Sequence, residues 1–131
     1  MATLSTNARK LLQEKNFAFL ATLNKDGSPQ VTPTWVDTDG KNILVNVATS
    51  RQKFRNVSRD PRVAVALIDQ TDPYKAVIVR GKVISIEKGP VAENHIDKMA
   101  KKYRGLEKYP NRVPGEQRVL LTVEPTRIVE R

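Results

Sequence analysis

Residues 17–37 read FAFLATLNKDGSPQVTPTWVD, and they contain the clearest strand and turn signals of the chain. Residues 17–23 form a short apolar run that predicts a buried strand, and residues 30–37 alternate as a second strand. Between them, Asp26-Gly27 is the dipeptide that favours a tight hairpin turn. The stretch therefore predicts two antiparallel strands that lie side by side.

The same alternation of strands and turns continues outward from this hairpin. Ser5 is a suitable helix cap, Asp60-Pro61 and Gly105 are helix stops, and Thr38-Asp39-Gly40 is a turn. We expect helices over residues 5–15, 51–59 and 90–104, and further strands over residues 42–48, 62–69, 76–87 and 118–130.

Three residues inside these strands carry positional information. Gly81 in a strand interior predicts a bulge or the close approach of another group, and Pro33 and Pro125 predict a sheet edge or a bulge. Successive hairpins with helices only at the periphery predict a mainly β, antiparallel, closed or nearly closed barrel over residues 1–131. Neither a Gly-x-Gly-x-x-Gly after a strand nor a Walker loop occurs, so a Rossmann or P-loop site is not expected.

Composition limits the setting in which the protein works. The chain has 131 residues, enough for one folded domain, and contains no cysteine, which excludes disulfides and favours a reducing cytoplasm. No apolar run approaches the roughly 18 residues that a membrane span needs, and residues 1–12 do not resemble a signal peptide. We therefore expect a cytoplasmic protein that does not enter a membrane.

The formal net charge of +9 indicates an anionic partner. The chain has only seven aromatic residues among its Phe, Tyr and Trp and no stacking motif, so nucleic acid is not the expected partner. The charge falls into two groups, and each could instead be a solvated helix face. The first group is Arg51, Lys53, Arg55, Arg59 and Arg62, and the second is Lys98, Lys101, Lys102, Arg104, Lys108 and Arg112.

The most informative segment for function is NVATSRQKFRN, residues 46–56, in which a strand ends and a helix begins. A helix start carries unpaired N–H groups and the positive end of the helix dipole. Arg51 and Lys53 stand in the expected first turn without any acid, an unfavourable arrangement unless an anion binds there. With the hydroxyls of Thr49 and Ser50, they predict a phosphate site. The alternative is that both cations point into water.

Two further features offer weaker signals. Thr32-Pro33-Thr34 on an open edge could receive a flat ring, or could be an ordinary edge strand with Trp35 in the core. His95 is the one histidine of the chain, and on its helix a surface position is as good an expectation as any other. One histidine without cysteine cannot build a zinc site, so we expect no metal. Turn chemistry explains Asp37, Asp39, Asp69 and Asp72, and no catalytic residue is identified.

These segments together resemble the pyridoxamine 5′-phosphate oxidase-like split barrels. The resemblance runs through residues 17–23, 26–35, 43–47, 50–56 and 60–64, and residues 103–105 and 118–127 are similar to the branch of small coenzyme F420-dependent oxidoreductases. It implies a six-stranded antiparallel split β-barrel with short peripheral helices, and a homodimer with two cofactor sites at the subunit interface. C-terminal substrate residues of the pyridoxamine oxidases proper have no match here, which disfavours vitamin B6 oxidation.

The resemblance also assigns the cofactor site. Arg51 and Lys53, with Asn56 nearby, would hold the cofactor phosphate. The ring system would lie between Thr32-Pro33-Thr34 on one side and Val47-Ala48-Thr49, next to Ser50, on the other.

The function expected from this resemblance is hydride transfer between coenzyme F420 and a small unsaturated organic substrate. The cofactor carries the difficult chemistry, which agrees with the lack of an evident acid–base set. The polyglutamate tail of F420 could meet the second basic group. The alternatives are an FMN-dependent reductase or oxidase of the same family, and a non-enzymatic flavin or tetrapyrrole binder.

Overall fold

The computed structural model describes residues 2–131. They contain seven antiparallel strands and three helices. In chain order they are α1 (Thr6–Gln13), β1 (Ala18–Leu23), β2 (Pro29–Thr34), β3 (Asp37–Thr38), β4 (Ile43–Ala48), α2 (Gln52–Arg59), β5 (Arg62–Ile68), β6 (Ala76–Lys88), α3 (Pro90–Arg104) and β7 (Arg118–Glu130).

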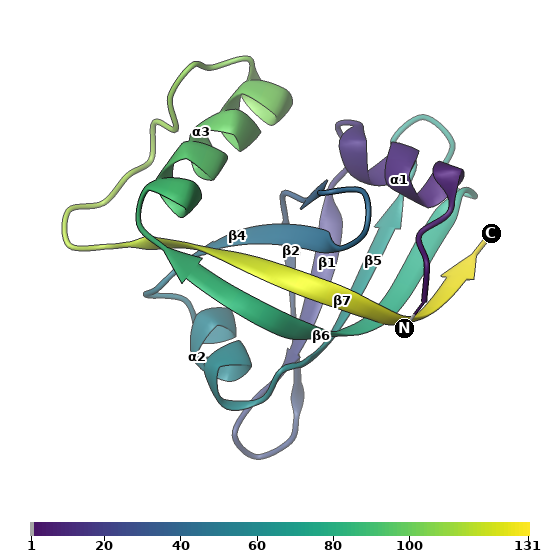
Figure 1. Cartoon of the computed structure of the whole chain (residues 1–131), viewed down its shortest axis with the longest axis horizontal. Coiled ribbons are helices and arrows are strands. Elements are labelled where there is room, and N and C mark those ends of the chain that lie inside the picture. Colours follow the sequence, from purple (N-terminus) through teal and green to yellow (C-terminus); the bar gives the residue numbers. More distant parts are fainter. Residues whose placement is uncertain (1) are drawn as a thin grey trace.

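The strands form one curled sheet in the order β2-β1-β5-β6-β7-β4-β3, with β2 and β3 at its two edges. Figure 1 shows α1 and α2 at opposite ends of this curled sheet, with α3 lying over β4 and β7. The predicted hairpin is present, since Ala21 pairs with Val31 and Gly27 takes the positive φ of 86° that the turn requires. This architecture confirms the predicted mainly β split barrel.

The strand count differs from the prediction because the expected strand over residues 30–37 is interrupted. It divides into β2 and the two-residue β3, which gives seven strands instead of six. At the break, the N–H of Val36 donates to the Tyr103 hydroxyl (3.1 Å), and its carbonyl accepts from Lys102 Nζ (2.7 Å). Side chains of α3 thus replace the strand partner that Val36 would otherwise need.

The predicted irregularity of the two long strands is also confirmed. The register between β6 and β7 shifts at Arg80/Gly81, where Gly81 pairs with Pro125. A Cβ atom at Gly81 would lie 2.6 Å from the Glu124 carbonyl oxygen, so the backbones approach too closely for any other residue. Pro125, which has no N–H for the ladder, therefore stands next to a bulge, as expected.

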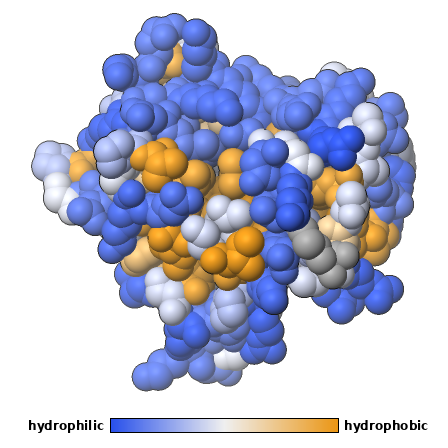
Figure 2. All heavy atoms as spheres, viewed as in Figure 1, coloured by the Kyte–Doolittle hydropathy of each residue, from blue (hydrophilic) through white to orange (hydrophobic). Residues whose placement is uncertain are grey.

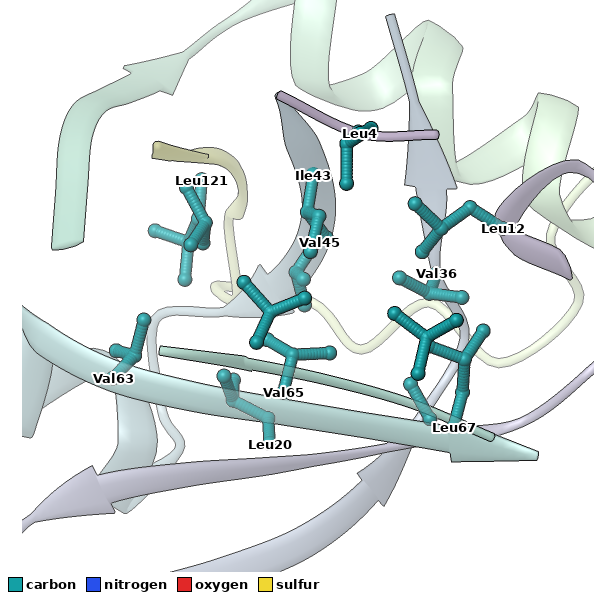
Figure 3. Close-up of a cluster of buried hydrophobic side chains, with 14 of the residues drawn as sticks. Leu4, Leu12, Leu20, Val36, Ile43, Val45, Val63, Val65, Leu67 and Leu121 are labelled. Carbon is teal, nitrogen blue, oxygen red and sulfur yellow. The ribbon is translucent and has the colours of Figure 1, made fainter. Parts of the chain in front are cut away.

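The core lies inside the curl of the sheet. Figure 3 shows Leu20, Val45, Val65 and Leu121 pointing into it from four different strands, and Leu12 of α1 entering from one end; all five are at most 1% exposed. Alternation of buried and exposed residues along β1 and β5 follows directly from the period of two in a strand.

Helix α3 forms a second, smaller cluster on the other side of β4. Its buried Ile96, Met99 and Tyr103 pack with the half-buried Trp35 and Tyr109. Trp35 stacks on Tyr103 at 5.2 Å between ring centroids. β4 is therefore covered on both faces, in agreement with its almost continuous apolar sequence.

Part of the sheet remains uncovered. Figure 2 shows apolar atoms gathered over the middle of the face on which β6 and β7 lie, surrounded by hydrophilic atoms. Ile84 and Ile86 of β6 are among the exposed apolar side chains. Within residues 2–131, no helix has both the length and the apolar character needed to cross a membrane.

Candidate functional site

A pocket of about 480 Å³ opens where the end of β4, the start of α2, the end of β2 and the loop before β7 meet. Six of the ten residues predicted for the cofactor site line it: Pro33, Thr34, Val47, Ala48, Arg51 and Lys53. Residues that the prediction did not include also line it, among them Asn46, Tyr109 and Arg118.

The start of α2 has the features of an anion site. Arg51 is the N-cap residue, its side chain makes no capping hydrogen bond, and the first turn contains no acid. The first N–H groups of a helix have no partner within the helix, and the dipole is positive at this end. The predicted combination of free donors and positive charge therefore stands at the wall of the pocket.

Lys53 is buried although it carries an ammonium group. Only 6% of the residue is exposed, and its Nζ donates to Oγ1 of Thr32 across 3.3 Å. Burial, together with the charges of Arg51 and Arg118, lowers the pKa of Lys53 to about 8. The ammonium form is thus disfavoured here until an anion compensates it.

Arg118, the first residue of β7, brings a third cation to the pocket. Its Nε donates to Oδ1 of Asn46 (2.8 Å), and its guanidinium lies over the ring of Tyr109 at 5.2 Å. Burial lowers the pKa of Arg118. Sequence reasoning missed this residue because Arg118 and Asn46 lie 72 positions apart and only the ladder between β4 and β7 joins them.

The remaining predicted residues do not line the pocket. Thr32 is close to it through its bond to Lys53. Ser50 donates to Glu116, and Thr49 Oγ1 accepts from the N–H of Gln117 (3.3 Å), so both hydroxyls contact the loop before β7.

Asn56 has a role in joining elements of the fold. It is fully buried, and its Nδ2 donates to Thr22 and Asn24, both at 3.0 Å. This side chain links α2 to the end of β1, and it is not among the residues that line the pocket.

His95 and Asp37 occupy positions that the sequence did not predict. His95 is 8% exposed, and its Nε2 lies 3.0 Å from Oδ2 of Asp37. Burial alone would raise the pKa of Asp37, but hydrogen bonds from His95 and Thr38 and the charge of Lys98 lower it to about 2. Asp37 is therefore a buried carboxylate with partners, and explaining it by turn chemistry was wrong.

The second basic group is largely neutralised within the protein. Four of its members pair with carboxylates: Lys98 with Asp37, Lys101 with Glu107, Lys108 with Asp97, and Arg112 with Glu93 and Asp97. Lys102 instead donates to the carbonyls of Leu12 and Val36, both at 2.7 Å. Among the ion pairs of the described residues, Lys102 and Arg104 have no carboxylate partner.

Comparison with known proteins supports the architecture. The family model described as pyridoxamine 5′-phosphate oxidase matches residues 4–130. A solved structure named F420 reductase is 32% identical over 92% of this chain and 94% of its own, with a TM-score of 0.79.

More distant structures share the fold alone. A putative pyridoxamine 5′-phosphate oxidase from Listeria innocua is 19% identical, over 87% of this chain and 86% of its own, with a TM-score of 0.65. HutZ, described as a haem storage protein from Vibrio cholerae, is 17% identical, over 98% and 95%, with a TM-score of 0.65. Proteins that share this barrel are therefore described with different functions, and the fold alone does not identify the ligand.

Proposed function

The chain belongs to the pyridoxamine 5′-phosphate oxidase family of split barrels, and from this premise we propose that it is an oxidoreductase that binds coenzyme F420 in the pocket described above. The reaction is hydride transfer between F420 and a small unsaturated organic substrate. The similarity to the structure named F420 reductase favours this cofactor over FMN.

The observation that carries the proposal is the meeting of three cations at one uncapped helix start. Arg51 and Arg118 each contribute to the lowered pKa of Lys53, so the three charges are close enough to repel one another. Glu116 is the one acid among the residues that line the pocket, so positive charge predominates there. A phosphate would accept hydrogen bonds from the cations and the helix N–H groups. Arg51, Lys53 and the start of α2 therefore fit a cofactor phosphate.

The other wall of the pocket fits a flat ring. Phe17, Trp35 and Tyr109 line it, and the rings of Trp35 and Tyr109 meet edge to face at 6.0 Å between centroids. When bound, the cofactor supplies the hydride chemistry. The protein binds the phosphate, orients the ring against Pro33 and Thr34, and keeps water from the apolar side.

We further propose that the working form is a homodimer built on the outer face of the sheet. In this face one row crosses five adjacent strands through the paired residues Pro33, Phe19, Ala66, Ile78 and Val129. Phe19, Ile78 and Val129 are 47%, 37% and 43% exposed. An apolar row across so many strands favours burial against another protein surface, and Pro33 joins the row to the pocket.

Parallel titration of the protein with F420, FMN and haemin tests the proposed cofactor. We expect F420 to bind more tightly than FMN, and reduced F420 to be oxidised when unsaturated test substrates are added. Tighter binding of FMN would assign the protein to the FMN-dependent alternative. Haemin binding without binding of either flavin-type cofactor would overturn the oxidoreductase proposal.

A further inference from the structure

Behind the pocket, a continuous chain of hydrogen bonds connects a buried carboxylate to Arg118. Asp37 Oδ2 lies 3.0 Å from His95 Nε2, and His95 Nδ1 lies 3.2 Å from Nδ2 of Asn46. Asn46 Oδ1 in turn accepts from Arg118 Nε at 2.8 Å. Asp37, His95 and Asn46 are each less than 9% exposed.

The direction of each hydrogen bond follows from two partners of which one can only accept and the other can only donate. The Ala92 carbonyl can only accept, and it lies 2.9 Å from Asn46 Nδ2, which identifies that atom as the amide NH2. Arg118 Nε can only donate, so the atom facing it is the amide oxygen. The second hydrogen of the NH2 group then meets His95 Nδ1, which must accept it. The ring proton is left on Nε2, where it donates to Asp37.

We propose that His95 is a positioning residue for the pocket: protonated on Nε2 alone, it holds the amide of Asn46 in the orientation that keeps Arg118 at the site. Arg118 is also fixed by the carbonyl of Asn46, which accepts from Nη2 at 3.3 Å. The effect on ligand binding rests on the proposed function. The direction of the hydrogen bonds from Arg118 to Asp37 does not depend on it.

A second proton on the ring would reverse this arrangement. Nδ1–H would then face the NH2 group of Asn46, and two donors cannot form a hydrogen bond with each other. If the amide rotated to avoid this contact, its NH2 group would face the Nε–H of Arg118.

Nitrogen NMR of the ring tests the orientation without any ligand. Because the chain has one histidine, ¹⁵N labelling of that residue type gives one pair of ring signals. We expect a protonated Nε2 and an unprotonated Nδ1 at neutral pH, together with slow solvent exchange of the Arg118 Nε–H. A protonated Nδ1 at neutral pH, or rapid exchange at Arg118, would overturn the proposal.

A pair of substitutions separates positioning from stability. His95→Asn places an amide oxygen near the position of Nδ1 and keeps the acceptor for Asn46, but loses the contact to Asp37. His95→Gln reaches Asp37 and loses that acceptor. We expect His95→Asn to unfold at the lower urea concentration yet to bind F420 and FMN like the parent, and His95→Gln to bind about tenfold more weakly, the effect of about 1.4 kcal/mol.

If His95 had a purely structural role, cofactor affinity would fall with stability, and His95→Asn would bind more weakly than His95→Gln. Equal affinities of the two variants, or affinity that follows the urea midpoint, would overturn the positioning role. If the parent binds neither cofactor, the proposed function fails, and the ring tautomer and Arg118 exchange still decide the inference.

Discussion

The ammonium group of Lys53 on α2 donates a hydrogen bond to Oγ1 of Thr32 on β2, although the residue is only 6% exposed. A hydroxyl is a weak partner for a buried charge, and among the ion pairs of the described residues none involves Lys53. Because no carboxylate of the described residues pairs with it, this lysine is available to an anion in the pocket.

Removing either Lys53 or Arg51 should weaken cofactor binding without lowering the stability of the protein. We expect Lys53→Met or Arg51→Ala to weaken cofactor binding by about 1.5–3 kcal/mol, the range for hydrogen bonds to charged groups. Without cofactor, stability should stay the same or rise, because a cation leaves a helix start. Titration calorimetry and urea unfolding measure the two effects. Lys41→Gln, an exposed change in the turn before β4, is the control, and parent-like binding by both site variants would refute the phosphate site.

The lowered pKa of Lys53 predicts a pH dependence of stability. The pKa is about 8 in the folded protein, against an ordinary value of 10.5, so between these values the unfolded chain binds more protons. Stability should therefore rise with pH from about 8 to 10.5, since the cost of the buried charge is present in full below 8 and is relieved as the lysine deprotonates.

Lys102, whose pKa burial also lowers to about 8, contributes in the same sense. The part due to Lys53 is therefore obtained by subtracting the pH profile of Lys53→Met from that of the parent. A difference that is flat between pH 8 and 10.5 would show that Lys53 keeps its ordinary pKa.

The apolar row on the outer face predicts how the dimer can be separated. Ile78→Glu places a charge in this row on β6, and Phe19→Lys places one on β1, on the other side of β5. Each should convert a dimer to a monomer in light scattering at micromolar concentration and weaken cofactor binding. Val91→Glu, at a 43% exposed position on α3, is the matched control. A parent that is monomeric with and without cofactor would contradict the proposed assembly.

The two neighbouring lysines of α3 should behave differently. Lys102→Met removes the side-chain donor of the Leu12 carbonyl and leaves Val36 only the longer contact from the Tyr103 hydroxyl (3.2 Å), and we expect a loss of about 1–3 kcal/mol in the free energy of unfolding. Lys101→Met removes an exposed pair with Glu107, and such pairs contribute about 0–1 kcal/mol. Urea unfolding of both variants measures the difference, and equal losses would contradict the structural role of Lys102.

Local features of the chain were readable from sequence because their causes are local. The Asp26-Gly27 turn, the helix start after Ala48 and the irregularity at Gly81 and Pro125 all follow from backbone conformations or missing donors at those positions. The same reasoning placed Arg51 and Lys53 at the start of α2, since the helix boundary and the charge pattern are both written in neighbouring residues.

The order of the strands and helices, the mainly β class and the basic helix start could therefore be predicted from the sequence. The contacts between distant side chains could not: Arg118 with Asn46, His95 with Asp37, and Lys102 with the carbonyls of Leu12 and Val36. The reason is that sheet register and the docking of α3 bring together groups 58 to 90 positions apart. Burial then changes their chemistry, and residues that look like solvated charges in the sequence become fixed parts of the fold or of the pocket.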